Sequence, residues 1–141
     1  MKLQQINKVL VSEEQGLIIA GTEDNLIRFF DLHTHKQVKS IVAHADAVTS
    51  LLIPSVQNSG KQLSISGTSS GGGPKGPTQF VSGGHDGAIR AWDIRTFNCT
   101  FDTIAHRRKY DEGILTLASS DRYPIIASGG ADSLIKIMHE Q

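Results

Sequence analysis

The chain has 141 residues and carries 14 lysines and arginines against 14 aspartates and glutamates, so its formal net charge is zero. This balance argues against a nucleic-acid-binding protein, which normally carries a basic excess. No apolar run approaches the ~18 residues that cross a bilayer, and no secretory leader is evident, so we expect no membrane insertion and a cytoplasmic protein. The single cysteine, Cys99, fits a reducing compartment.

Three segments share one pattern: a short apolar run, a small-residue pair, an aspartate, and a run that alternates apolar and basic residues. The segments are residues 17–32, 79–94 and 124–139. Asp24, Asp86 and Asp132 occupy the same place in the three copies. The pattern predicts two strands joined by a tight turn in each copy.

An Ala-His pair forms a second repeated feature, and it ends at His44 and again at His106. Each pair lies between two further strand-like runs, so the full repeat has four short strands. Asp86 and Asp132 are 46 residues apart, near the ~40–45 residues of one propeller blade. The preceding interval is longer because it contains the Gly/Ser/Pro-rich segment 56–78, which we expect to be a disordered loop.

These repeats resemble WD40 repeats, in which an Ala-His or Gly-His pair, Ser-Gly-x-x-Asp and Trp-Asp recur. The middle copy carries all four characteristic residues: His44, Ser82, Asp86 and Trp92. The resemblance implies a buried structural tetrad, and the donors and acceptors fit that role. An aspartate can hold one imidazole nitrogen, while the other nitrogen meets a serine hydroxyl that accepts the indole N–H.

The flanking copies retain only part of this tetrad. In the first copy Asp24 is present, but Ala20 and Phe30 replace the serine and the tryptophan. The third copy retains three of the four residues: His106, Ser128 and Asp132. Met138 replaces its tryptophan, so we expect the complete network only in the middle copy.

We therefore predict an all-β fold, a partial WD40 β-propeller over residues 1–141. The three blades are predicted at about residues 4–42, 43–104 and 105–141, each an antiparallel four-stranded sheet except that the last lacks its outer strand. The last strand, residues 134–138, would then be an unpaired edge. Because propellers normally close rings of 4–8 blades, we expect the isolated chain to be poorly stable or to self-associate.

An enzymatic alternative starts from Ser82, His44 and Asp86, which nominally form a Ser-His-Asp set. Ser82 falls inside a predicted interior strand and lacks the Gly-x-Ser-x-Gly turn of α/β-hydrolases. We therefore predict no catalytic residue and no enzyme activity. A hydrolase that uses Ser82 is the alternative from a different class.

Six histidines raise the question of a metal site. His33 and His35 fall in a predicted turn, and no cysteine or second histidine pair has the spacing of zinc ligands. We therefore predict no metal, no cofactor and no small-molecule substrate.

The cluster Arg107, Arg108 and Lys109 is followed by two acidic residues. It forms either a solvated loop or a docking patch for an acidic partner, because loops at the rim of a scaffold often carry recognition. Asp46 and His85, in other predicted loops, are further possible partner contacts.

Two segments narrow the resemblance among WD40 proteins: Ala-Val-Thr-Ser-Leu at 47–51 and Ala-His-Arg-Arg-Lys-Tyr-Asp-Glu at 105–112. With the chain's last strands, they resemble the C-terminal blades of the striatin family. This resemblance implies a non-enzymatic scaffold whose protein partners belong to a complex of protein phosphatase 2A and kinases. The family's coiled coil has no counterpart here, so recruitment of the phosphatase through it is not implied. The alternative is an adaptor of another multiprotein complex, for example in ubiquitin ligation or trafficking.

Overall fold

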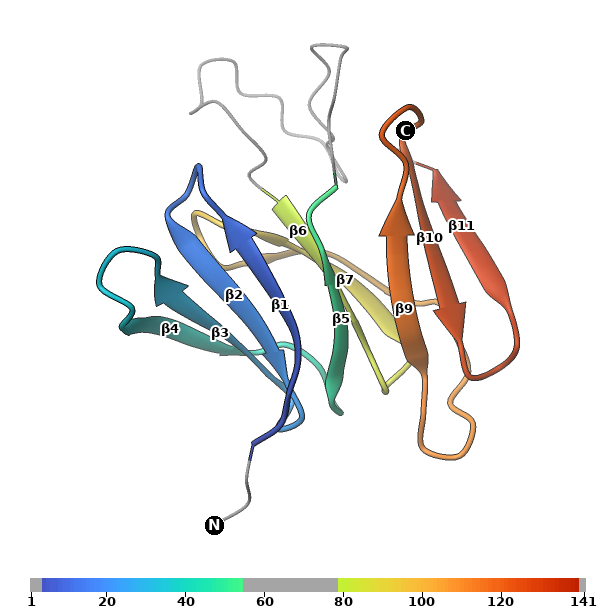
Figure 1. The fold of residues 1–141 in the computed structure, drawn as a ribbon. Coiled ribbons are helices and arrows are strands. Elements are labelled where there is room, and N and C mark those ends of the chain that lie inside the picture. Colours follow the sequence, from blue (N-terminus) through green and yellow to red (C-terminus); the bar gives the residue numbers. More distant parts are fainter. Residues whose placement is uncertain (1–3, 55–78, 140–141) are drawn as a thin grey trace.

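A computed structural model describes residues 4–54 and 79–139, and the predicted loop 56–78 lies outside these residues. The described residues form eleven strands in three antiparallel sheets, which stand side by side as an arc (Figure 1). The first sheet contains β1 (Ile6–Ser12), β2 (Leu17–Thr22), β3 (Leu26–Asp31) and β4 (Gln37–Val42). The second contains β5 (Val48–Leu52), β6 (Gln79–Gly84), β7 (Ala88–Asp93) and β8 (Cys99–Ile104). The third contains β9 (Ile114–Ser119), β10 (Ile125–Gly130) and β11 (Ile135–His139).

The all-β prediction of antiparallel blades, the last with three strands, is confirmed. In the described part of the chain β11 pairs only with β10, so it forms the outer edge of the third sheet. It begins at Ile135, one residue later than predicted.

The turns between the second and third strands of the sheets share one backbone conformation. The residue after the repeated aspartate has a positive φ in each turn: 71° at Asn25, 78° at Gly87 and 66° at Ser133. Glycine and asparagine tolerate this left-handed region best, which explains the first two residues. These turns place Asp24, Asp86 and Asp132 at the same rim of the arc (Figure 1).

The sheets are held together by apolar side chains that pack face to face. Between the first and second sheets, Phe29 meets Phe80 edge to face, with ring centroids 5.8 Å apart. Between the second and third sheets, Ile89 belongs to a core that also contains Ile114 and Ile126. The middle sheet therefore buries both of its faces.

The inner strands make a repeated close contact with the preceding sheet. A Cβ built on Gly21 would lie 2.7 Å from Cγ1 of Val48, the first residue of β5. A Cβ built on Gly83 would lie 2.7 Å from Cγ2 of Ile114, the first residue of β9. Glycine at these positions lets the next inner strand approach, and we call this arrangement the inner-strand contact.

We expect Phe80→Ala to lower the free energy of unfolding by about 3–5 kcal/mol, because Phe80 is 0% exposed between two sheets. The control Val42→Ala removes a side chain that is 75% exposed and should change stability by less than about 0.5 kcal/mol. Denaturant titrations followed by the fluorescence of Trp92 measure both values. Equal losses in the two variants would contradict the packing described here.

Candidate functional site

The second sheet contains a continuous chain of four hydrogen-bonded side chains. Trp92 Nε1 donates to Ser82 Oγ at 2.8 Å, and Ser82 Oγ lies 2.7 Å from His44 Nε2. His44 Nδ1 lies 2.9 Å from Asp86 Oδ1. The chain joins β6 and β7 to the connection that precedes β5, so it ties the sheet to the segment that enters it.

The partners select one arrangement of protons. Carboxylate Asp86 only accepts, so His44 Nδ1 carries the hydrogen and donates to it. His44 Nε2 then accepts from the Ser82 hydroxyl, whose oxygen accepts from Trp92. With this arrangement every hydrogen-bonding atom of the four side chains that takes part has a partner.

Asp86 is the acceptor for several donors at once. Its carboxylate also accepts from the backbone N–H of Ala45 at 2.9 Å and of Ala88 at 3.1 Å. Burial raises the pKa of Asp86, but the hydrogen bonds from His44 and from these N–H groups outweigh burial and hold the pKa well below its usual range. Asp86 is therefore ionised at neutral pH.

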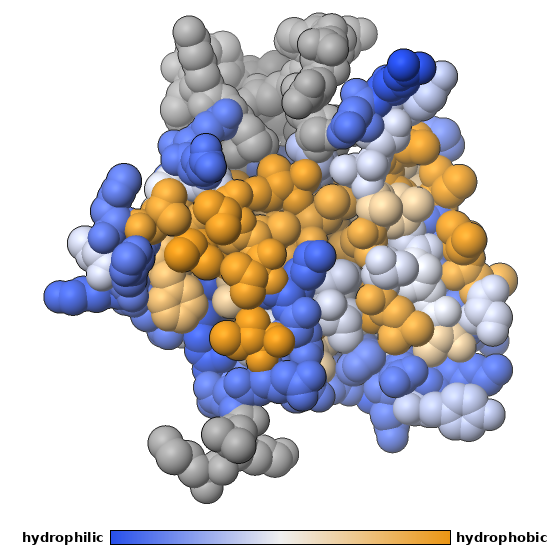
Figure 2. All heavy atoms as spheres, viewed as in Figure 1, coloured by the Kyte–Doolittle hydropathy of each residue, from blue (hydrophilic) through white to orange (hydrophobic). Residues whose placement is uncertain are grey.

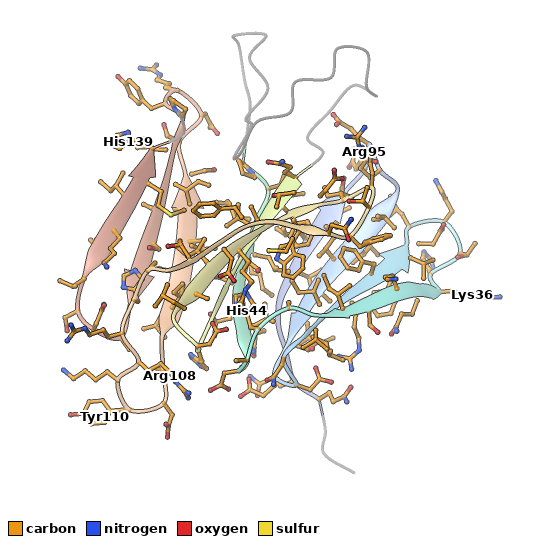
Figure 3. The ribbon with its side chains drawn as sticks, turned by 180° about the vertical axis from the view of Figure 1, so that it is seen from behind. Lys36, His44, Arg95, Arg108, Tyr110 and His139 are labelled. Atoms are coloured by element: carbon orange, nitrogen blue, oxygen red, sulfur yellow. The ribbon has the colours of Figure 1, made fainter. Side chains whose placement is uncertain are left out.

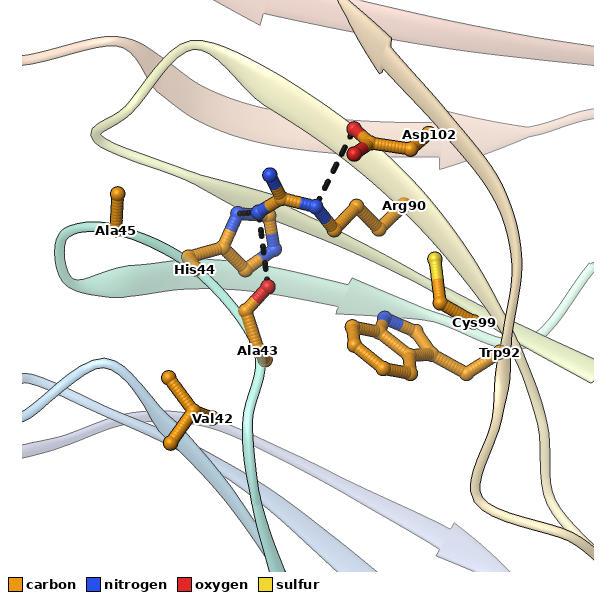
Figure 4. Close-up of a pocket in the computed structure, with 8 residues that line it drawn as sticks. All are labelled: Val42, Ala43, His44, Ala45, Arg90, Trp92, Cys99 and Asp102. Carbon is orange, nitrogen blue, oxygen red and sulfur yellow. Dashed lines mark hydrogen bonds and ion pairs between the residues drawn. The ribbon is translucent and has the colours of Figure 1, made fainter.

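Arg90 is a member of this network that the sequence reasoning missed. Its Nη1 donates to Asp86 Oδ2 at 3.0 Å. The same Nη1 also donates to the carbonyl of Ala43 at 2.9 Å, and Nε lies 3.2 Å from Asp102 Oδ1 (Figure 4). It lines a shallow groove beside His44 (Figure 4). A pattern in the sequence could have identified Arg90: a basic residue stands four positions after the repeated aspartate in the first and the middle copies. In the first sheet this residue is Arg28, whose Nη2 lies 2.6 Å from Asp24 Oδ2.

The outer sheets contain shorter versions of the network. In the third sheet His106 Nδ1 and Nε2 lie 2.8 Å from Asp132 Oδ1 and Ser128 Oγ, respectively. These hydrogen bonds end at Ser128, because the side chain of Met138 has no N–H to donate. In the first sheet Asp24 is held by Thr22 and Arg28 instead of by a histidine.

The environment of Ser82 does not suit a nucleophile. Its side chain is 0% exposed, and its oxygen is shared between His44 and Trp92. Nucleophilic attack needs a hydroxyl that a substrate carbonyl can reach, beside donors for the developing oxyanion. His44 lies in the connection between β4 and β5 (Figure 3) and is only 3% exposed.

Two features tested in the sequence have no counterpart in the described residues. Residues 4–54 and 79–139 contain no group of three or more His, Cys, Asp or Glu side chains placed to hold a metal ion. His33 and His35 are exposed in the turn between β3 and β4. The same ranges contain no helix that is long and apolar enough to cross a membrane.

The structure brings the predicted partner contacts to one rim, which we call the recognition rim and define as residues 43–47, 84–87 and 105–113 (Figure 1). Arg108 Nη2 lies 2.6 Å from Asp46 Oδ2, which joins two loops across neighbouring sheets. His85 is half-buried, and its Nδ1 accepts from the N–H of Gly113 at 3.3 Å. The backbone N–H of Arg107 donates to Asp132 at 3.3 Å.

A tight hairpin projects from the recognition rim at residues 109–112. Lys109 and Glu112 exchange backbone hydrogen bonds of 2.8 and 3.0 Å. The two residues at its tip, Tyr110 and Asp111, have φ angles of 53° and 63°, which non-glycine residues rarely adopt. Tyr110 is 89% exposed and extends from the loop (Figure 3), with Lys109 Nζ 5.7 Å from its ring centroid. The sequence reasoning did not select Tyr110.

We expect Ser82→Ala to lower the free energy of unfolding by about 2–4 kcal/mol, because it leaves both His44 Nε2 and Trp92 Nε1 without a partner in the interior. Ser128→Ala leaves only His106 Nε2 unpaired and should cost about half as much. Urea titrations of the two variants measure the difference. Equal costs would show that the Trp92 hydrogen bond contributes nothing.

We expect Asp86→Asn to lower the free energy of unfolding by about 2 kcal/mol at pH 7, because the carboxylate accepts charge-assisted hydrogen bonds. The pKa of Asp86 is lower in the folded than in the unfolded protein, so this contribution is present above the unfolded pKa of about 3.9 and is lost as the pH falls below it. Denaturant titrations from pH 7 to pH 3 should therefore show wild type and variant converging. A constant difference over this range would contradict the role given to the carboxylate.

Comparison with known proteins agrees with this geometry. Residues 35–93 match the family of WD domains, described as the G-beta repeat. A chain in the crystal structure of the mitotic checkpoint complex superposes with a TM-score of 0.69, covering 99% of this chain and 35% of that one at 18% sequence identity. At this identity the likeness shows the fold alone.

Striatins are similar to this chain in sequence. A striatin homologue of Dictyostelium discoideum is 36% identical over 135 residues, and human striatin-4 is 36% identical over 133 residues. The matches cover 96% and 94% of this chain but only 14% and 15% of those proteins. The repeats, the arc of antiparallel sheets and these matches agree: the chain contains a WD40 repeat at residues 35–93 and is similar to striatins over nearly its whole length.

Proposed function

We propose that this chain is a non-enzymatic protein-interaction module of a striatin-like scaffold, acting in the cytoplasm within a complex of protein phosphatase 2A and kinases. The similarity to striatins supports the scaffold role. The observation that carries the proposal is the hairpin at the recognition rim, where Tyr110 is 89% exposed.

The hairpin has the properties of a binding element. Tyr110 and Asp111 both occupy the left-handed region, where each non-glycine residue costs on the order of 1–3 kcal/mol. Paired backbone hydrogen bonds between Lys109 and Glu112 hold this conformation. An exposed tyrosine on such a preorganised turn can bury a large surface in a partner while losing little conformational entropy.

The charges around Tyr110 define the chemistry of the partner. Arg108 already lies against Asp46 and is 3.7 Å from Asp111, so most of its charge is compensated within the rim. The side chains of Arg107 and Lys109 are exposed on the same loop, and so are those of the acidic residues Asp111 and Glu112. We propose a protein surface with an apolar pocket for the Tyr110 ring and acidic groups at the edge of that pocket.

The non-enzymatic part of the proposal is supported by the buried chain of four side chains. The residues that nominally form a Ser-His-Asp set are fully engaged in joining strands, and Ser82 is 0% exposed. If Ser82 has only this structural role, Ser82→Ala lowers the free energy of unfolding and abolishes no activity. A hydrolase that uses Ser82 as its nucleophile would instead lose its activity in this variant.

An adaptor of a different complex, in ubiquitin ligation or trafficking, would use the same recognition rim. It differs from the striatin-like scaffold only in the proteins that bind. Identification of the bound proteins therefore separates the two proposals.

We expect affinity purification with this chain to retain kinase or phosphatase subunits of striatin complexes, and Tyr110→Ala to weaken their binding at least about tenfold. The matched control is Tyr123→Ala, which removes a tyrosine that is 66% exposed in the loop between β9 and β10, away from the recognition rim. Binding is measured by titration with each purified partner.

The outcomes separate the two parts of the proposal. If the two tyrosine variants bind equally well, the recognition rim is not the docking site. If only components of another complex are retained, the striatin-like role is wrong and the adaptor role holds.

A further inference from the structure

The shallow groove beside His44 lies between the first and second sheets, so residues that the structure describes form both of its walls (Figure 4). One wall is the end of β4 and the connection after it, with Val42 and Ala43. The other wall is the face of β7 and β8 that carries Arg90 and Asp102. Figure 2 shows hydrophobic residues gathered over the first sheet and along β9–β11, on the outer sheets of the arc. The groove is a different surface, with charged groups inside it.

Asp102 distinguishes this groove from the repeated framework. It lies opposite Arg90 on the neighbouring strand, whereas the residue opposite Arg28 in the first sheet is Ser40. Arg28 forms its ion pair with Asp24 without a carboxylate at that position. The repeat therefore does not need a carboxylate there to hold the arginine against its aspartate.

The carboxylate of Asp102 is oriented at one oxygen and accessible to a ligand. Its Oδ1 lies 3.2 Å from Arg90 Nε, yet the side chain is 53% exposed. Arg90 also contacts Asp86, so one guanidinium lies between two carboxylates and the formal charge of the cluster is negative. The electrostatic complement of this cluster is a cation placed beside Asp102.

The surroundings of Asp102 suit a long side chain. Val42 is 75% exposed at the edge of the groove, and Cys99 lies on the opposite wall (Figure 4). Ile104, which is 69% exposed, lies two residues beyond Asp102 and therefore on the same face of β8. Lysine and arginine have aliphatic stems that cover such apolar surface while their charged ends reach a polar group.

We propose that this groove binds a lysine or arginine side chain from an extended segment of a partner protein. The charged end of that side chain donates to the carboxylate of Asp102, and its stem lies against Val42 and Cys99. An apolar side chain two residues away in the segment contacts Ile104, because alternate residues of an extended chain point to the same side. This contact is separate from the proposed docking of Tyr110 and does not depend on it.

The probe is the acetylated and amidated peptide Leu-Ser-Arg-Ser-Leu, which places an apolar residue two positions from the arginine in both directions. It should bind about fivefold more tightly than the same peptide with citrulline, which has the shape of arginine without its charge. NMR titrations followed by the indole N–H signal of Trp92, the single tryptophan of the chain, measure both affinities. Equal affinities, or no detectable binding of the arginine peptide, would overturn the proposal.

Two variants place the ligand at Asp102. Asp102→Asn keeps the size of the side chain and should lower the affinity for the arginine peptide to that for the citrulline peptide. The matched control Glu14→Gln removes one negative charge from the exposed turn between β1 and β2 and should bind as the wild type does. Unchanged binding by the Asp102 variant, or an equal loss in both variants, would contradict a specific contact with this carboxylate.

The single cysteine gives a test that leaves all charges in place. Cys99 is exposed and lines the groove, so alkylation with iodoacetamide should fill the groove and block binding of the arginine peptide. Cys99→Ser, treated with the same reagent, should still bind. If the alkylated chain binds as well as the untreated one, the peptide lies elsewhere and the proposal is wrong.

Discussion

Face-to-face packing between neighbouring sheets is the constraint on which the rest of this structure depends. A three- or four-stranded sheet has no interior of its own, so it becomes stable only when its apolar face is covered by another layer. Here Phe29 from one sheet and Phe80 from the next share a core, and Ile114 enters the space above Gly83. Among the described residues, the middle sheet is covered on both faces, whereas each outer sheet is covered on one. The stability of each sheet therefore depends on the sheets that lie beside it.

The chain of hydrogen bonds from Asp86 to Trp92 depends on this packing. Polar side chains are strongly coupled only where water is excluded, and the neighbouring sheet excludes water from His44 and Ser82. In return, the chain fixes the connection before β5 against the turn between β6 and β7. Since that connection and that turn both belong to the recognition rim, a buried polar network determines the position of the surface that we propose for binding.

The recognition rim shows how a repeat fold acquires an individual surface. The aspartates of the turns and the glycines of the inner strands recur from sheet to sheet. Among the described residues, the hairpin with Tyr110 occurs only in the connection before the third sheet. Its ion pair from Arg108 to Asp46 spans two connections and holds the hairpin against the neighbouring sheet. Variation in these connections changes what binds without altering the packing beneath them.

The strands and the four side chains of the central network could be predicted from local patterns. These features follow from local patterns: apolar residues with a period of two, turn residues after each aspartate, and repeated spacing. The tertiary structure alone decided the ion pair between Arg108 and Asp46, which are 62 positions apart, and the contacts of Arg90. Among the described residues it also decided which apolar side chains are covered, because Ile89 and Ile135 are alike in sequence pattern but only Ile89 has another sheet beside it. Pairing within a sheet is a property of neighbouring segments, whereas burial depends on how the sheets are placed against one another.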